Sequence, residues 1–259
     1  MLKSERKGVV LTITLDRADK RNALNTSLVS ELKDALTHAA EDASLRVVVL
    51  TGAGEVFSAG ADLASLQALQ TASYEDNLAD SAHLAELFEL IVRHPKPIIA
   101  RVNGHAIAGG CGLAAVCDFA IAADGAKLGF TETRIGFVPA IVSIFVLRKL
   151  GESAARDLLL RGHLISSAEA ARIGLITKSV AAGELDQEVD VLASELATRT
   201  SGTAIELTKR LLANLQGMSL SEALSHASKV NAEARGTDDC KAGIDAFLNK
   251  LDPPWRTND

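Results

Sequence analysis

The sequence has few cysteines and aromatic residues, and it lacks long apolar runs. Its three cysteines (Cys111, Cys117 and Cys240) are odd in number and lack paired spacing, which predicts free thiols in a reducing compartment. One Trp, one Tyr and a net charge of −6 argue against nucleic-acid binding. No apolar run approaches the roughly 20 residues of a membrane span, and the charged N-terminus shows no signal peptide. We therefore expect a cytoplasmic protein with no membrane or nucleic-acid partner.

The remaining composition is that of an ordinary globular α/β protein. Apolar residues make up 47% of the 259 residues and charged residues 23%. The length suits one large domain, or one domain with a C-terminal appendage. Near the N-terminus the pattern predicts a strand over Val9–Leu15, a helix over Thr26–Asp42 and a buried strand over Val47–Leu50. This order suggests a βαβ unit.

The central stretch runs from Pro97 to Asp118. The β-branched run Ile98–Val102 predicts a buried strand, and a Gly/Ala-rich helix follows a tight loop. Small residues at 108–110 fall where the loop enters the helix, and the first N–H groups of a helix have no helical partner. A ligand oxygen can approach such groups closely, so we expect an oxyanion site built from backbone. The alternative is that the glycines only let the helix pack tightly.

A second Gly/Ala-rich loop, Gly52–Asp62, follows the strand Val47–Leu50. Gly52 and Gly54 match the first two glycines of a dinucleotide-binding fingerprint, but Phe57 occupies the place of the third. A dinucleotide-dependent oxidoreductase is therefore one alternative function.

Helices dominate the rest of the chain. We expect a helix over Tyr74–Val92, then short strands over Phe119–Ala122, Lys127–Phe130 and Leu175–Val180. The patterns Ser166…Glu169, Thr203…Glu206 and Ser219…Glu222 predict capped helix starts. Leu/Ala stripes on the C-terminal helices either cover the core or form a subunit interface.

Four motifs in this order resemble the enoyl-CoA hydratase/isomerase (crotonase) family. They are Phe57–Leu63 (F-S-A-G-A-D-L), Asn103–Cys111 (N-G-H-A-I-A-G-G-C), Cys117–Asp118 and Gly129–Gly136 (G-F-T-E-T-R-I-G). Three further pieces, Arg21–Leu24, Ala168–Leu175 and Gly243–Leu248, extend the resemblance along nearly the whole chain.

This resemblance implies a spiral of β-β-α units with two roughly perpendicular sheets over residues 1–195. Residues 196–259 would then form a C-terminal helical trimerisation region, so that the protein is a homotrimer or homohexamer. The implied substrate is an acyl-CoA thioester, with coenzyme A as part of the substrate, no permanently bound cofactor and no metal.

The resemblance also implies the site residues. The N–H groups of Ala61 and Gly109 would hold the thioester oxygen as an enolate forms, each contributing on the order of 3 kcal/mol, and Glu132 would be the acid/base. Arg17, Lys20 and Arg21 are placed in sequence to meet phosphates, or they simply belong to a solvated loop. The residues expected to contact coenzyme A or substrate are Ala23, Leu24, Ser58, Ala59, Gly60, Asp62 and Ala140.

The chain departs from the hydratases of this family at one position. These hydratases use two glutamates, and the first falls on Gly112, where we expect open space for a branched acyl group or extra water. One glutamate is the pattern of the family's Δ3,Δ2-enoyl-CoA isomerases, whereas the run Gly136–Val142 resembles hydratases of branched substrates such as methylglutaconyl-CoA. We therefore expect a hydratase that acts on a 2-enoyl-CoA thioester. The alternatives are an isomerase and a non-catalytic acyl-CoA-binding protein. Arg134 is either a partner for a distal carboxylate or an ordinary surface residue.

Overall fold

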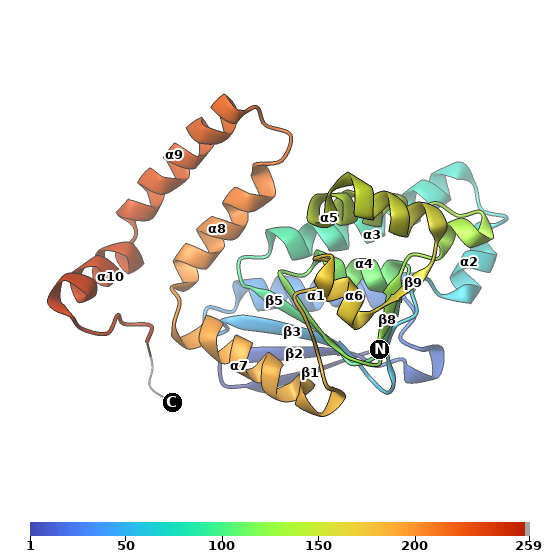
Figure 1. The fold of residues 1–259 in the computed structure, drawn as a ribbon, viewed down its shortest axis with the longest axis horizontal. Helices are drawn as coiled ribbons and strands as arrows, with labels where there is room; N and C mark the ends of the chain where they lie inside the picture. The colour runs from blue at the N-terminus through green and yellow to red at the C-terminus, as the bar shows by residue number, and fades with distance from the viewer. Residues whose placement is uncertain (257–259) are drawn as a thin grey trace.

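Figure 1 shows the fold. Between residues 47 and 129 the chain alternates between two sheets, so that each turn of this spiral adds one strand to each sheet. The computed structural model describes residues 1–256, so residues 257–259 of the expected C-terminal region lie outside the described residues. The strands form a six-stranded sheet and a four-stranded sheet. The expected α/β fold is confirmed.

The two sheets differ in the length of their strands. Across the larger sheet, neighbouring strands follow the order β1 (Leu2–Lys7), β2 (Val10–Leu15), β3 (Val47–Gly52), β5 (Ile98–Val102), β7 (Phe119–Ala123) and β10 (Lys178–Val180). The smaller contains β4 (Val56–Ser58), β6 (His105–Ile107), β8 (Lys127–Gly129) and β9 (Leu164–Ser166). In the larger sheet only β1 runs antiparallel to its neighbour, and in the smaller sheet only β9 does.

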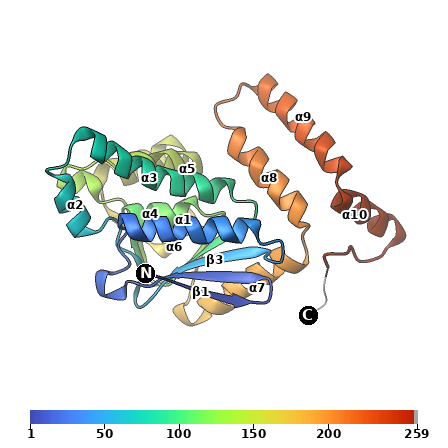
Figure 2. The same ribbon diagram turned by 180° about the vertical axis from the view of Figure 1, so that it is seen from behind.

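Helices enclose the larger sheet on both faces and extend from it at the C-terminal end (Figures 1 and 2). They are α1 (Thr26–Glu41), α2 (Leu63–Leu69), α3 (Tyr74–Arg93), α4 (Gly109–Val116), α5 (Ala140–Arg161), α6 (Ser167–Arg172), α7 (Leu185–Thr198), α8 (Gly202–Asn214), α9 (Leu220–Gly236) and α10 (Asp238–Asn249). Three short 3-10 segments are Ala18–Lys20, Glu132–Ile135 and Ala182–Glu184.

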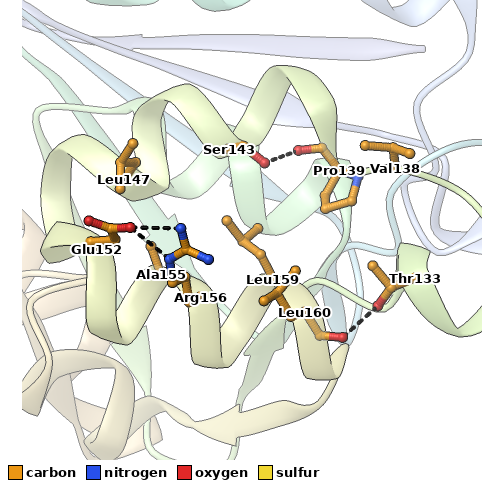
Figure 3. A pocket seen from close by; sticks show the side chains of 10 residues that line it. All are labelled: Thr133, Val138, Pro139, Ser143, Leu147, Glu152, Ala155, Arg156, Leu159 and Leu160. Atoms are coloured by element: carbon orange, nitrogen blue, oxygen red, sulfur yellow. Dashed lines mark hydrogen bonds and ion pairs between the residues drawn. The ribbon is translucent and has the colours of Figure 1, made fainter.

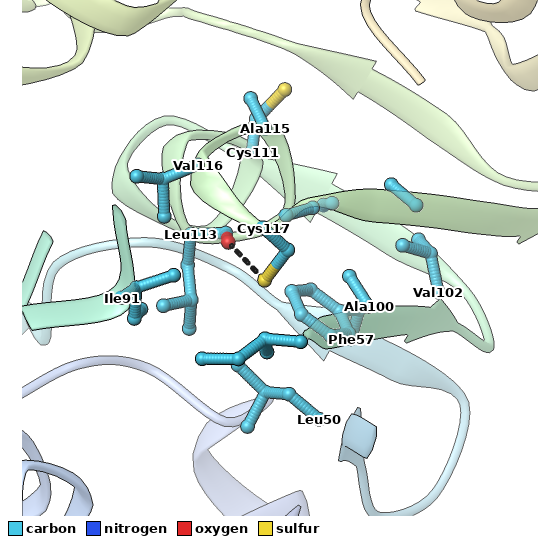
Figure 4. Packing of buried hydrophobic residues seen from close by; sticks show 14 of the residues in the cluster. Leu50, Phe57, Ile91, Ala100, Val102, Cys111, Leu113, Ala115, Val116 and Cys117 are labelled. Atoms are coloured by element: carbon cyan, nitrogen blue, oxygen red, sulfur yellow. Dashed lines mark hydrogen bonds between the residues drawn. The ribbon is translucent and has the colours of Figure 1, made fainter. Parts of the chain in front are cut away.

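The alternation of side chains along β3 explains why both faces of the larger sheet are covered. Val48 and Leu50 join the main core with α1 and α4, while Val47 and Val49 pack with α7. Every residue of β3 is buried, as expected of a parallel strand between two helical layers. Figure 4 shows Leu50 within the main core.

Helix α4 crosses the middle of this core. All of its residues after Gly109 are buried, including Cys111 and Leu113. The Cys117 thiol at its end donates to the Leu113 carbonyl at 3.2 Å (Figure 4). The three cysteines are free, as predicted.

Several expected elements are confirmed, and others were missed. The expected strand and helix over 98–102 and 74–92 occur as β5 and α3, with α3 one residue longer. Strands β1, β4, β6 and β9 were not predicted, since three of them are only three residues long. The prediction that Thr203 caps a helix is wrong, because α8 begins two residues earlier. Its cap is Ser201, whose side chain accepts from the Ala204 N–H. Ser219 and Glu222 form the predicted reciprocal cap.

The loop after β3 argues against the dinucleotide alternative. A dinucleotide-binding fingerprint opens a helix, whereas Gly52 and Gly54 lead into strand β4. A Cβ on Gly52 would lie 2.4 Å from the Phe57 carbonyl oxygen, so this glycine serves the close approach of β3 and β4.

The C-terminal helices form an arm beside the spiral. Helix α8 contacts α3, while α9 and α10 contact each other and α8, and both views show α9 and α10 projecting beyond the spiral (Figures 1 and 2). The boundary expected between residues 195 and 196 falls inside α7, which packs on the larger sheet as a whole.

Candidate active site

Three chain segments meet at one edge of the smaller sheet. Strands β4, β6 and β8 are parallel neighbours, so their carboxyl ends, Ser58, Ile107 and Gly129, lie along the same edge. The Ala108 N–H donates to the Gly129 carbonyl at 2.8 Å. The topology therefore brings together the loops that carry Ala61, Gly109 and Glu132.

Two glycines let the first two of these loops pack backbone against backbone. A Cβ on Gly60 would lie 2.8 Å from the Ile107 carbonyl oxygen. A Cβ on Gly110 would lie 2.3 Å from the Ser58 carbonyl oxygen. Side chains here would push the loops apart, and this explains why both are rich in Gly and Ala.

The N–H of Ala61 points away from the strand segment beside it. Leu24 and Ala61 form a parallel bridge in which the Leu24 N–H donates to the Gly60 carbonyl (2.7 Å) and the Asp62 N–H donates to the Leu24 carbonyl (2.8 Å). In such a bridge the residue opposite Leu24 turns its own N–H to the other side. Ala61 is exposed, and its N–H has no acceptor among residues 1–256.

Gly109 supplies a second N–H of this kind at the first position of α4. It too has no acceptor among the described residues, in keeping with the first turn of a helix. The preceding residue, Ala108, has φ 53° and ψ −126°, which is unusual for a residue with a side chain. Such strain persists where the surrounding structure imposes it, often at functional sites.

Glu132 is a buried carboxylate with an unsatisfied oxygen. It begins the 3-10 segment Glu132–Ile135 and is 9% exposed. Its Oε2 atom is buried without a hydrogen-bond partner among residues 1–256, and burial raises the pKa of the carboxyl group. An unpaired, desolvated carboxylate is suited to accept and return a proton.

Glu132 lies close enough to Cys111, in the first turn of α4, for its charge to act on the Cys111 thiol. Burial raises the pKa of the Cys111 thiol to about 12, and the negative charge of Glu132 adds to this effect. The thiol stays protonated at neutral pH, so Cys111 is a buried apolar residue rather than a nucleophile.

The expected open space at Gly112 is absent, so that prediction was wrong. A Cβ at this position would lie 2.2 Å from Val142 Cγ1 and 3.1 Å from Phe88 Cε2. Val142 is 4% exposed, and Phe88 stacks edge-on against Phe145 at 5.6 Å between ring centroids. Helix α5 thus fills the place where the side chain of the absent glutamate would begin.

Arg17 also differs from its predicted role as a phosphate partner. Its guanidinium donates to Asp62 Oδ2 at 2.8 Å and to the Ala23 carbonyl at 2.6 Å, and its side chain is 13% exposed. Lys20 and Arg21 are exposed and have no ion-pair partner among the described residues. These two cations remain available for phosphate groups.

The expected substrate-contacting residues surround the Leu24–Ala61 bridge, apart from Ala140. Ser58 is fully buried, and its hydroxyl donates to the Asn22 carbonyl at 2.9 Å. Ala59 donates its N–H to the Arg21 carbonyl at 3.0 Å. Ala140 is exposed at the start of α5. Ala23, Leu24, Ser58, Gly60 and Asp62 are buried, and Ala59 is half-buried.

Asn22 is a structural residue of this site that the sequence analysis missed. It is fully buried at φ 54°, and its side chain donates to the Ala53 and Val56 carbonyls and accepts from the Arg17 N–H. Asn tolerates the left-handed conformation better than other residues with side chains, and this is the signal that marks it in a polar loop.

A hollow of about 640 Å³ lies between α5 and the segment after Glu132 (Figure 3). Apolar side chains dominate its walls, and Thr133, Ser143 and the Glu152–Arg156 ion pair add polar groups. Ala61, Gly109 and Glu132 do not line it.

Residues 1–256 contain neither a cluster of metal-binding side chains nor a helix suited to crossing a membrane. No group of three or more His, Cys, Asp or Glu side chains in this range is arranged to hold a metal ion. No helix in the same range has the length and apolarity that crossing a membrane requires.

Known proteins resemble this chain in both sequence and fold. A family model described as Enoyl-CoA hydratase/isomerase matches residues 5–258. A Thermus thermophilus protein named "Putative enoyl-CoA hydratase" is 42% identical over 247 residues, covering 95% of this chain and 97% of the relative. The crotonyl-CoA hydratase of Syntrophomonas wolfei is 37% identical, covering 96% and 95%. The structure of Pseudomonas aeruginosa AtuE superposes with a TM-score of 0.93, 35% identity and 99% coverage of both chains.

Proposed function

The chain belongs to the enoyl-CoA hydratase/isomerase family and is an enzyme of the enoyl-CoA hydratase type; we propose that it adds water to a 2-enoyl-CoA thioester, or removes it, through an enolate. The observation that carries this proposal is the buried carboxylate oxygen of Glu132, which has no hydrogen-bond partner among residues 1–256. The loop of Glu132 follows the same sheet edge as the loops of Ala61 and Gly109, whose N–H groups have no acceptor among these residues.

The proposed reaction uses Glu132 twice. Its carboxylate takes a proton from water while the water oxygen bonds to C3, and the C2–C3 π electrons move to the thioester oxygen as an enolate. The Glu132 carboxylic acid then gives its proton to C2, and the thioester carbonyl re-forms. One water is added, and Glu132 returns to its starting charge. A pKa raised by burial favours both transfers.

The two N–H groups account for the stability of the enolate. Ala61 and Gly109 would donate to the thioester oxygen as its charge grows. Donors already oriented by a parallel bridge and a helix start need little reorganisation during the reaction. The helix dipole of α4 adds positive potential at Gly109.

The packing at Gly112 favours a second candidate, a Δ3,Δ2-enoyl-CoA isomerase. In that reaction Glu132 would remove a proton from C2 of a 3-enoyl thioester and return it to C4, so no second carboxylate is needed. Position 112 has no carboxylate, and Val142 closes the space.

Coenzyme A would bind at the loop that holds Lys20 and Arg21, whose exposed cations suit its phosphates. A branched acyl group such as methylglutaconyl is proposed from the run Gly136–Val142 alone, because the space expected at Gly112 is filled.

We also propose that the protein is a homotrimer or homohexamer assembled through the C-terminal helices. Large apolar side chains are exposed on α9, on α10 and just beyond α10: Leu220, Leu224, Ile244, Phe247, Leu248 and Leu251. Large apolar side chains left exposed on neighbouring helices are typical of a contact between proteins.

A panel of acyl-CoA thioesters tests the function. Hydration of 2-enoyl-CoA substrates is followed by loss of the conjugated enoyl absorbance, and double-bond migration by its appearance from 3-enoyl substrates. A kcat/KM for hydration of about 10⁴ M⁻¹s⁻¹ or more, the lower end of the usual range for enzymes, supports the proposal. Migration without hydration would favour the isomerase, and coenzyme A binding with neither activity would leave a non-catalytic acyl-CoA-binding protein.

A further inference from the structure

We infer that the buried Arg17–Asp62 ion pair is a positioning device for the Ala61 N–H donor; this inference rests on the proposed function. Neither side chain needs to touch the substrate. Together they hold the two strand segments that orient the Ala61 peptide.

Arg17 clamps the Leu24–Ala61 bridge from both sides. One guanidinium nitrogen donates to the carbonyl of Ala23, just before Leu24, at 2.6 Å. The other donates to the carboxylate of Asp62, just after Ala61, at 2.8 Å. The same side chain therefore fixes residues adjacent to both members of the bridge.

Asp62 is held equally firmly at its end of the clamp. Its Oδ1 atom accepts from the Ala64 N–H at 2.9 Å as the cap of α2, so each carboxylate oxygen has a separate donor. The hydrogen bond from Arg17 keeps the pKa of Asp62 below its usual range. The Asp62 side chain is 11% exposed, and weak solvent screening strengthens its pairing with Arg17.

The start of the clamp is anchored to the polar loop. The Arg17 N–H donates to Asn22 Oδ1 at 3.0 Å, and the Asn22 N–H donates to the Arg17 carbonyl at 2.9 Å. These two bonds fix Arg17 in the polar loop, and the Arg17 side chain connects this loop to Asp62. Because oxyanion donors act only at hydrogen-bond distance from the developing charge, a small displacement of Ala61 affects the transition state more than substrate binding.

The test compares Arg17→Lys and Asp62→Asn with the wild-type enzyme. Lysine bonds only one of the two acceptors at this geometry, and asparagine retains the cap of α2 but loses the ion pair. We expect kcat to fall by about tenfold to a hundredfold, part of the loss seen when one oxyanion donor is removed. The Kd of coenzyme A should change by less than about threefold.

A bound 3-oxoacyl thioester gives a readout that a merely structural role would not move. Acetoacetyl-CoA forms an enolate with its own near-ultraviolet absorbance, and an intact oxyanion site increases the enolate fraction. This fraction should fall in both variants in parallel with kcat. Lys209→Gln is the matched control, because it breaks another largely buried ion pair, Lys209–Asp118, between α8 and the end of α4. It should lower the melting temperature while leaving kcat and the enolate fraction of the folded protein unchanged.

Wild-type kcat and enolate fraction in folded Asp62→Asn would overturn the inference and leave the proposed function intact. Equal losses of kcat and coenzyme A affinity would also overturn it, since they indicate a collapsed loop. A wild-type enzyme with no turnover and no enolate signal would instead refute the proposed function, and this inference with it.

Discussion

The Cγ1 atom of Val142 lies 2.2 Å from the point at which a side chain on Gly112 would begin. Glycine at 112 and valine at 142 are therefore one packing unit that joins α4 to α5. The absence of a second carboxylate is built into this contact, because a glutamate at 112 requires α5 to move or Val142 to become smaller.

The first prediction concerns this pair. Gly112→Ala should lower the free energy of unfolding by about 1–3 kcal/mol, the usual effect of overpacking. Val142→Ala should relieve most of this loss when the two changes are combined. Denaturant unfolding of the two single variants and the double variant gives the coupling energy, and simple additivity would contradict the contact.

Gly112→Glu combined with Val142→Ala tests whether a second carboxylate adds hydration. We expect hydration of simple 2-enoyl thioesters to change several-fold. The pH optimum should move with it, because two neighbouring carboxylates raise the pKa of one of them. Gly112→Glu alone should fold poorly, in contrast to a site with open space.

The second prediction concerns Glu132. Glu132→Gln keeps the shape but not the base, so kcat should fall by roughly 10²- to 10⁴-fold while the Kd of coenzyme A is unchanged. In the wild type the acid limb of the kcat/KM profile should lie above the ordinary carboxyl pKa of about 4.5. Near wild-type kcat in the variant would remove Glu132 from the mechanism.

The third prediction concerns His94, whose side chain is 1% exposed. Its Nε2 atom lies 3.1 Å from the Leu36 carbonyl oxygen, and its Nδ1 atom lies near the Lys96 carbonyl oxygen and the Lys96 N–H. Burial lowers its pKa below 6.5. As the pH falls below 6.5, the unfolded chain takes up a proton first. The free energy of unfolding should therefore decrease until the pH reaches the lower pKa of the folded state, by about 1.4 kcal/mol for each unit between the two pKa values.

Glu132 opposes this effect, so the measurement belongs in the Glu132→Gln background. Its raised pKa means that stability is lost as the pH rises from 4.5 through the pKa of the folded state. Thermal unfolding from pH 5 to 8 should show the His94 dependence clearly once Glu132 is removed. The dependence should largely vanish on adding His94→Gln; an unchanged slope would assign it elsewhere.

The fourth prediction concerns the phosphate contacts. Changing Lys20 or Arg21 to Ala should raise KM for an acyl-CoA by about twofold to fivefold, the range of exposed charge pairs, and leave kcat unchanged. The effect should weaken at high salt. A thioester of N-acetylcysteamine, which has no phosphate, is the control substrate, and an equal effect on it would contradict phosphate binding.

The fifth prediction concerns assembly. Light scattering at micromolar protein should give three or six times the chain mass. Phe247 is 81% exposed on α10, and Phe247→Asp should shift the mass toward the monomer by placing a charge in the contact. Asn249→Asp adds the same charge to the same helix without removing an apolar side chain and should dissociate less. A monomeric wild type would contradict the proposed trimer.

The sequence alone identified the long elements and the main candidate catalytic residues. Extended apolar runs predicted β3 and β5, and helical spacing predicted α1 and α3, because these periodicities are local properties of the chain. The motifs around Ala61, Gly109 and Glu132 were sufficient to indicate the family and a backbone oxyanion site, whose catalytic roles remain predictions.

Only the tertiary structure decided how side chains from distant segments meet. The polar loop around Arg17 led to the prediction that this residue binds phosphate, yet Arg17 pairs with Asp62, 45 residues away. The glycine at position 112 predicted open space beside it, yet the Val142 side chain of α5 fills that space. The three-residue strands β4 and β6 carry too little local pattern to be recognised, and parallel pairing with distant partners stabilises them. Residue type and periodicity determine local structure, whereas the occupancy of a site depends on the packing of elements far apart in the chain.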